Sequence, residues 1–410
     1  MKRYKYKARD QEGKLVSGFK NALSQKEVAD ALNRENLIAV SIDEVRRAKK
    51  SKKAKSETSN TGKGKVSPQE VAIFCRQLTT MLGAGVSVAE AIEDLGKAEN
   101  NQKFQNVLMQ VVADVRSGLA LTEAFSKHPS VFSDLFVHML SSGEESGKLA
   151  QVLEDLAIYL EKSVKLKNQV KSAMMYPSFV GGFFLLVLFG LVFFMVPMFE
   201  DLFSSFGAEL PGPTQITVNI SNALISNLPI VVVLLVLAIV GIRAAYKTKG
   251  GRMFFDKLKI SIPVFGPLIL KVTMSRFFQT LSTLLKSGID VIGSLDVAAK
   301  VSGSAPVEDI VMKVRTGIVE GSSLSEELEK YDIFPRLTVS MASAGEKSGA
   351  LDDLLDKISD YYTDEVDADV AGLSSLIEPV MIVSLGLLVG VFVITMYLPI
   401  FQMAGVMAGG

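Results

Sequence analysis

The residues with the clearest potential for chemistry lie in two acidic motifs, GEESG and GEKSG, about two hundred residues apart. Each motif places a glutamate between two glycines, just before a long segment with helical character. Glycine tolerates positive φ and serine can cap a helix, so the motif predicts a tight interhelical turn with a carboxylate fixed near a helix start. A surface on which a partner docks is the alternative interpretation. The residues concerned are Gly143, Glu144, Gly147, Gly345, Glu346 and Gly349.

No nucleotide-binding or catalytic motif stands out. A P-loop needs GxxxxGK[ST] after a strand, whereas TGKGK at 61–65 lies in a polar, lysine-rich segment and GEKSG lacks the spacing. No Ser/His/Asp set, catalytic carboxylate pair or metal cluster is recognisable. The one cysteine, Cys75, excludes a disulfide framework within the chain and a CxxC zinc pair. We therefore expect no enzyme activity, no metal and no cofactor, so a partner would have to hydrolyse any ATP that the protein's work requires.

The segments that carry these motifs are duplicated. Residues of the first copy recur 203 positions later, as Phe74 and Phe277 do, and then 202 positions later, as Phe132 and Phe334 do. A match of this length indicates duplication of a whole domain, because solenoid repeats have much shorter periods. Helical spacing without period-2 alternation predicts that both copies are all-α bundles.

Three uncharged runs, at 172–199, 210–242 and 379–410, are long and apolar. A helix needs roughly 20 apolar residues to span a bilayer, so we expect three transmembrane helices. The alternative for any single run is a buried helix of a soluble protein. The fold class that follows is a mainly α, polytopic membrane protein with two homologous cytoplasmic bundles.

Charged residues near the runs predict the orientation. Lysines precede the first run and basic residues follow the second, whereas the segment between them carries Glu200, Asp201 and Glu209 and no Lys or Arg. Basic residues mark the cytoplasmic side. We therefore expect a cytoplasmic N-terminus and a periplasmic C-terminus. MKRYKYKARD has no apolar region and predicts no cleavable signal peptide.

The rest of the chain divides by composition. Residues 1–45 predict a small ββαβ module, and 46–65 form a lysine-rich linker that we expect to be disordered. This linker can also rest on anionic membrane lipids; it lacks interleaved aromatic residues, which disfavours nucleic acid as a partner. The remaining expected segments are the first bundle 66–171, span 172–199, periplasmic loop 200–223, span 224–246, connector 247–271, second bundle 272–375, span 376–401 and periplasmic tail 402–410.

Matched prolines mark the first and third spans. Proline removes a helical hydrogen bond and promotes a kink, so we expect a kink site in both helices. These sites would face the membrane lipids or a protein helix within the membrane. Glu378 is an additional ionisable residue that lies either at membrane depth or at the cytoplasmic interface. The candidate membrane-facing residues are Pro177, Pro197, Glu378, Pro379 and Pro399.

The two copies differ in charge where they approach the membrane. The first copy is basic and the second is acidic, so we expect these faces to attract each other, within one chain or between subunits. The candidate residues are Lys165, Lys167 and Lys171, beside Lys162, and Asp364, Glu365 and Asp367, beside Asp360 and Asp369.

As a set, several longer motifs resemble the inner-membrane platform proteins of type IV pilus machines, within the type II secretion F superfamily. They include FCRQLTTMLGAGVSVAEAI, FSDLFVHMLSSGEESGKL, FGAELPGPTQ, EKSGALDDLLDKISDYY and LIEPVMIV. The resemblance covers nearly everything from residue 66 onward, and residues 1–45 fit the family's N-terminal module. The long basic linker departs from the family pattern.

The resemblance implies a non-enzymatic platform in the bacterial inner membrane. It implies that the bundles engage hexameric cytoplasmic ATPases and that the spans face pilin subunits. Further implied partners are other inner-membrane alignment proteins and further copies of the chain.

Three other functions remain open from the sequence. A type II secretion platform would have the same fold. A small transporter is disfavoured because the spans have few polar side chains, and a membrane enzyme is disfavoured because no catalytic set is visible.

Overall fold

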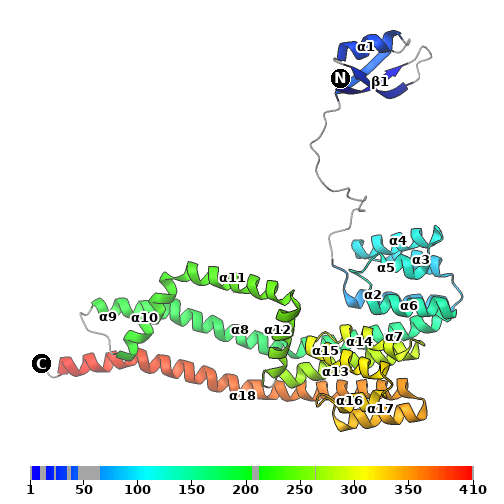
Figure 1. The fold of residues 1–410 in the computed structure, drawn as a ribbon. Helices are drawn as coiled ribbons and strands as arrows, with labels where there is room; N and C mark the ends of the chain where they lie inside the picture. Colours follow the sequence, from blue (N-terminus) through cyan, green and yellow to red (C-terminus); the bar gives the residue numbers. More distant parts are fainter. Residues whose placement is uncertain are drawn as a thin grey trace. The chain divides into compact units, whose positions relative to one another are not determined.

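The protein consists of two compact units, Met1–Thr61 and Gly62–Gly410. The computed structural model describes residues 2–9, 15–22, 25–34, 38–44, 65–205, 212–263 and 265–408 (Figure 1). Apart from Lys65, the expected linker at 46–65 lies outside the described residues.

The N-terminal unit is a three-stranded antiparallel sheet with one helix. Strand β1 (Lys2–Arg9) is central and pairs with β2 (Leu15–Ala22) and β3 (Ile38–Glu44). Helix α1 (Gln25–Arg34) lies between β2 and β3 in the chain. Its apolar face buries Val28 and Leu32, and Ala8 of β1 is also fully buried. The chain order of the described elements is strand, strand, helix, strand.

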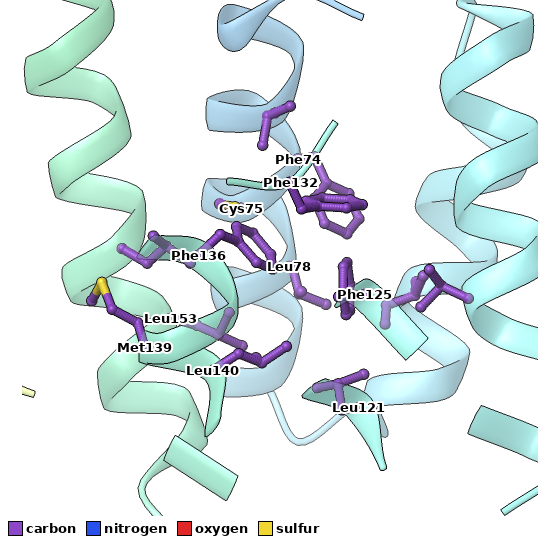
Figure 2. Close-up of a cluster of buried hydrophobic side chains, with 14 of the residues drawn as sticks. Phe74, Cys75, Leu78, Leu121, Phe125, Phe132, Phe136, Met139, Leu140 and Leu153 are labelled. Carbon is purple, nitrogen blue, oxygen red and sulfur yellow. The ribbon is translucent and has the colours of Figure 1, made fainter. Parts of the chain in front are cut away.

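The first copy of the repeat is a helical bundle. Ser67 starts α2 with a capping box, because its side chain accepts from Glu70 N and Glu70 accepts from Ser67 N. Five phenylalanines, one from each of α2, α4 and α5 and two around the start of α6, fill the core with ring contacts (Figure 2). The helices are α2 (Pro68–Gly83), α3 (Val88–Ala98), α4 (Gln102–Arg116), α5 (Leu121–Ser126), α6 (Asp134–Ser146) and α7 (Leu149–Ala173).

The second copy repeats this plan after a connecting helix, α12 (Lys249–Ser261). Its core contains Phe277, Phe278 and Phe334, and Tyr362 stacks on Phe278. The prediction of two all-α bundles is confirmed for the described residues. The helices are α13 (Phe265–Lys286), α14 (Val291–Val301), α15 (Ala305–Val319), α16 (Leu324–Glu329), α17 (Arg336–Ser348) and the first part of α18 (Leu351–Ala408).

The apolar part of the chain is also helical. Two helical stretches, Leu149–Asp201 and Leu228–Tyr246, are long and apolar enough to cross a membrane, and Pro379–Ile394 of α18 is a shorter apolar stretch. The pair α12 and α13 passes the same test only when counted as one span bent by 116°. The elements are α8 (Met175–Gly190), the π-helix η1 (Leu191–Met195), α9 (Val196–Ser205), α10 (Gly212–Ser226) and α11 (Leu228–Tyr246).

Two of the expected loop segments are helical where the structure describes them. The predicted loop 200–223 contains the end of α9 and most of α10, and residues 402–408 of the predicted tail continue α18. Helix α10 packs against α9, η1 and α18 and buries Val218 and Ser221. The Ser221 hydroxyl donates to the Val192 carbonyl over 2.6 Å, which satisfies a backbone acceptor inside the irregular π-helix.

Candidate functional sites

The glutamates of the two acidic motifs bind the start of a short neighbouring helix. Glu144 accepts from the backbone N–H of Leu121 (2.6 Å) and Thr122 (2.8 Å) and from the Thr122 hydroxyl. In the second copy, Glu346 accepts from Leu324 N (2.5 Å), Ser325 N (3.2 Å) and the Ser325 hydroxyl (2.5 Å).

Each carboxylate therefore caps the helix that precedes its own helix in the chain. The N-terminal N–H groups of α5 and α16 have no partner within their own helix, and the helix dipole favours a negative charge there. The sequence predicts a carboxylate fixed near the start of the helix that follows each motif, whereas the structure places it at the start of α5 or α16. The motif serine does not cap that next helix either, because Ser146 and Ser348 donate to carbonyls one turn back in their own helices.

The glycines of the motifs have two different roles. Gly147 and Gly349 end α6 and α17 with φ values of 69° and 71°, a conformation that favours glycine. Gly143 and Gly345 lie inside the helices, where the next helix passes closely. A Cβ at Gly143 would lie 3.1 Å from Val152 Cβ, and one at Gly345 would lie 2.9 Å from Leu351 Cα. The interhelical turn therefore begins later than the sequence predicts.

The second motif borders a polar groove of about 800 Å³ between α16 and α17. Ser323, Glu326 and Glu329 line it from α16, and Ser340 and Lys347 line it from α17. Among the motif residues, Glu145 and Lys347 are exposed, whereas Glu144 and Glu346 are half-buried. The role of the motifs in docking a partner remains a prediction.

A polar seam joins the two bundles. The Tyr159 hydroxyl of α7 lies 3.3 Å from Thr280 Oγ1 of α13, and Gln279 Nε2 donates to the Tyr159 carbonyl over 3.2 Å. The Ser142 hydroxyl donates to the Ser287 carbonyl over 2.6 Å. The two repeats therefore contact each other through α6 and α7 of the first and α13, α14 and α18 of the second.

Lys162 carries the charge pairing across this seam. Its ammonium group lies 3.0 Å from Asp356 and 2.9 Å from Asp360. Burial opposes the charged form, but the hydrogen bonds to Asp360 and Asp356 outweigh it and raise the pKa of Lys162. Burial likewise opposes the charged form of Asp356, and the Lys162 hydrogen bond and charge nevertheless hold the pKa of that carboxyl below its usual value.

The other predicted charges are not paired in this way. Lys165, Lys167, Lys171 and Asp364 make no ion pair among the described residues. Glu365 pairs instead with Lys271 of its own bundle at 2.9 Å. Asp367 accepts a hydrogen bond from Gln169 Nε2 over 3.1 Å, so it contacts the first copy without an ion pair.

Two ionic clusters were not predicted from the sequence. Arg76 of α2 donates to Glu161 (2.7 Å) and Glu154 (2.5 Å) of α7. Asp256, only 3% exposed, accepts from the Tyr246 hydroxyl (2.6 Å) and from Ala305 N (3.1 Å), which ties the end of α11 to α15. The second cluster could have been suspected from the sequence, because Asp256 is an acidic residue within the amphipathic segment 249–261.

The matched prolines lie in different surroundings. Pro177 lies three residues after Met174, where α7 ends and α8 begins, and Pro197 is the second residue of α9, just after η1. In the second copy, α18 is one continuous helix through Pro379 and Pro399. The helix is therefore interrupted near the matched prolines in the first copy only. The side chains of Glu378 and Pro399 lie outside the described part of the structure.

No site for a metal ion is visible in the described part of the chain, where no three His, Cys, Asp or Glu side chains come together suitably.

Comparison with known proteins identifies the family. The profile described as "Type II secretion system (T2SS), protein F" matches residues 74–197 and 277–399, and the profile of that protein's N-terminal domain matches residues 1–43. The chain belongs to the type II secretion system protein F family. Each of the two matched segments covers one bundle from its first helix to the end of the apolar segment that follows, so the duplicated unit includes its membrane helix.

Relatives align along most of the chain. A "Type IV pilus assembly protein PilC" of Myxococcus xanthus is 40% identical over 348 residues, 84% of this chain and 82% of the relative. The protein of the same name in Thermus thermophilus is 38% identical over 99% of both chains. A "Type II secretion system protein F" of Pseudomonas aeruginosa is 27% identical over 98% of this chain and 99% of the relative. With its apolar helices, this member of the family is a multi-pass protein of the inner membrane.

Proposed function

We propose that the chain is the inner-membrane platform protein of a type IV pilus assembly machine. In this proposal it couples the motion of a cytoplasmic ATPase to the insertion or removal of pilin subunits at the pilus base. It acts as a structural protein and not as an enzyme.

The observation that carries the proposal is the gradient of similarity among the relatives. Those named for type IV pilus or fimbrial assembly are 32–40% identical, whereas those named for type II secretion are 27–29% identical. The same fold in a secretion system is therefore the less well supported alternative.

The fold supports a division of labour. Both bundles lead through their last helix, α7 or α18, into an apolar helix, so we assign ATPase docking to the bundles and pilin contact to the apolar helices. Glu145 and Lys347 occupy matched, exposed positions next to the capping glutamates and carry opposite charges. The two bundles would thus present different surfaces to the ATPase.

Photo-crosslinking in cells tests this assignment. A photoreactive amino acid replaces the exposed Glu145 or Lys347, which spares the capping role of Glu144 and Glu346. A second set of positions uses Phe179 and Leu387, which are exposed apolar residues of α8 and α18. We expect capture of an ATPase at the first pair and of pilin at the second, identified by mass spectrometry.

Asp309, on the exposed face of α15, is the control position. Capture of neither partner, or equal capture at Asp309, would contradict the proposal. Capture of secretion pseudopilins in place of pilin would favour the alternative machine.

A further inference from the structure

A pocket of about 280 Å³ lies beside α12, between the end of α7 and the starts of α13 and α15. Its walls are largely apolar and include Val170 and Met174 of α7 and Leu268 and Val272 of α13. This volume is far larger than a single water molecule needs. The pocket therefore has room for a small polar group with apolar atoms attached to it.

The polar end of the pocket contains a hydroxyl group without a partner. Ser304, which precedes α15, is 4% exposed, and its Oγ has no hydrogen-bond partner in the described structure. The side chain does not cap α15 either. A buried hydroxyl without a partner is costly, and the start of a helix favours a negative charge. An anion that accepts from Ser304 would satisfy both.

Arg276 of α13 supplies positive charge at the same place. It is half-buried and makes no ion pair among the described residues. The carboxylate of Asp256 also lines the pocket, but it is balanced by Lys259 at 3.0 Å and Arg252 at 3.8 Å. A Cβ added to Gly303 would lie 3.8 Å from Arg276 Nη1, so the guanidinium group lies beside the turn that begins α15.

The first repeat has neither feature at the equivalent positions, both of which the structure describes. The residue equivalent to Arg276 is Ile73, and the residue equivalent to Ser304 is Asn101. Asn101 caps its helix, α4, and also donates to Glu70 over 3.0 Å, so its side chain is satisfied. The cation and the unpartnered hydroxyl therefore belong to the second repeat and are not general features of the bundle.

The surroundings of the pocket suit the surface of a membrane. Helix α12 directly follows α11, which is apolar enough to cross a bilayer, and leads to α13 (Figure 1). Phe254, which is 64% exposed, Leu258 and Ile262 lie four residues apart and share one face of this segment. An amphipathic helix with exposed Phe and Leu lies in the interface, with its apolar face in the lipid. The phosphates closest to the pocket would then be those of phospholipid headgroups.

We propose that this pocket binds the phosphate group of an anionic phospholipid. The Arg276 guanidinium and the Ser304 hydroxyl donate to the phosphate oxygens at the start of α15, in the charge-assisted contact that Arg makes with phosphates. The glycerol and the first part of the acyl chains lie along the apolar walls. By the topology that the charges predict, the lipid belongs to the cytoplasmic leaflet. The inference goes beyond the proposed function, because it concerns a lipid ligand and holds for a pilus or a secretion machine.

Lipid retention by the purified full-length protein tests the site. The protein in detergent receives equal amounts of dioleoyl phosphatidylglycerol and dioleoyl phosphatidylcholine, and native mass spectrometry counts the lipids that stay bound. We expect a severalfold preference for phosphatidylglycerol, which Arg276→Gln should abolish and Arg276→Lys should partly keep. Lys257→Gln is the matched control, because Lys257 is exposed on the same α12 and does not line the pocket.

Ser304→Ala gives a second readout that does not require the Arg276 variants to fold. Without added lipid, this variant should melt at the same temperature as the unsubstituted protein or slightly higher, because it removes a buried hydroxyl that has no partner in the described structure. Phosphatidylglycerol should raise the melting temperature of the unsubstituted protein more than that of Ser304→Ala, because a ligand stabilises the state that binds it.

Three results would overturn the proposal. The first is equal retention of the two lipids by the unsubstituted protein. The second is retention of phosphatidylglycerol by Arg276→Gln at the level of Lys257→Gln. The third is a rise in melting temperature with soluble glycerol phosphate as large as that with phosphatidylglycerol, which would assign the pocket to a soluble phosphate compound.

Discussion

A lysine at the same position of each repeat forms an ion pair, but the acid comes from a different helix in each repeat: Asp114 in the first and Glu327 in the second. In the first repeat, Asp114 of α4 pairs with Lys127 at 3.1 Å. In the second repeat, Lys330 corresponds to Lys127, but Gly317 replaces the aspartate and Glu327 of α16 supplies the carboxylate at 2.5 Å. A Cβ at Gly317 would collide with the Glu327 carboxyl group, so the glycine makes room for the relocated acid.

This exchange predicts a compensating double substitution. Gly317→Ala should destabilise the second bundle by roughly 1–3 kcal/mol, because its methyl group collides with Glu327. Gly317→Asp with Glu327→Ala recreates the arrangement of the first repeat and should recover most of the stability of the unsubstituted protein. Thermal unfolding of the purified protein in detergent measures both.

Gly83 provides the matched control for this prediction. It lies in helix α2, and a methyl group added to its Cα would point into open space, so Gly83→Ala should be neutral or slightly stabilising. Equal destabilisation by the Gly317→Asp single substitution and the double substitution would refute the exchange.

The capping glutamates support a second prediction at the same scale. Glu144→Ala leaves two backbone N–H groups and a hydroxyl of α5 without their acceptor, and we expect a loss of about 1–2 kcal/mol of stability. Glu346→Ala should have the same effect through α16. Glu145→Ala removes only a hydrogen bond from Ser141 and serves as the control. If Glu144→Ala and Glu346→Ala have the same melting temperature as the control Glu145→Ala, the caps do not stabilise the bundles.

At the scale of elements, the contact of α7 with α18 should depend on pH. The raised pKa of Lys162 means that its contribution is complete below about pH 10 and is lost as the pH rises through the folded-state pKa. The lowered pKa of Asp356 means that its contribution is complete above about pH 4 and is lost as the pH falls through the folded-state pKa. The pair therefore stabilises the seam between these limits.

Lys162→Met tests this dependence. Because the Lys162 side chain is 37% exposed, we expect a loss of no more than about 1 kcal/mol near neutral pH. The difference in melting temperature from the unsubstituted protein should shrink below about pH 4, where the carboxylates protonate. Lys313→Met breaks an exposed pair on α15 and should show no such trend. A difference that persists unchanged in acid would contradict the assignment.

The helices could be predicted from the sequence, but their contacts could not. Apolar spacing, capping residues and glycine stops mark the bundle helices locally, so motifs such as SPQEV and GEESG locate helix ends within a few residues. Helix α10 was missed because a helix of mixed polarity in an uncharged segment resembles a loop. Its burial depends on α9, η1 and α18, which come together only in the folded chain.

The sequence predicts that opposite charges attract between the two repeats, but not which residues form the ion pairs. The opposite charges of the two approaches to the membrane are visible in the sequence, yet Lys162 and not Lys165 or Lys167 pairs across the seam. Lys167, five positions from Lys162, points to a different face of the helix, whereas Lys165, three positions on, lies on the same face nearly one turn farther along. Net charge alone therefore does not select the partner. The capped helices α5 and α16 likewise could not be inferred from the motif that caps them.

At the scale of the whole molecule, charge predicts which ends of the apolar helices are cytoplasmic. Thr248 lies between α11 and α12 among basic residues, and Ser226 lies at the opposite end of α11. With Cys75→Ala as background, we expect Ser226→Cys to react with an impermeant maleimide in spheroplasts. Thr248→Cys should react only after the membrane is opened. Labelling of Thr248→Cys in sealed spheroplasts would reverse the proposed topology.

The continuity of α18 has a mechanical consequence. Its 58 residues form one rod about 87 Å long, from the core of the second bundle through the apolar segment. The corresponding path in the first repeat is interrupted at Met174 and again by the π-helix. A tilt or twist of the second bundle would therefore pass along one unbroken helix, whereas in the first repeat it would pass a turn at Met174 and a π-helical segment.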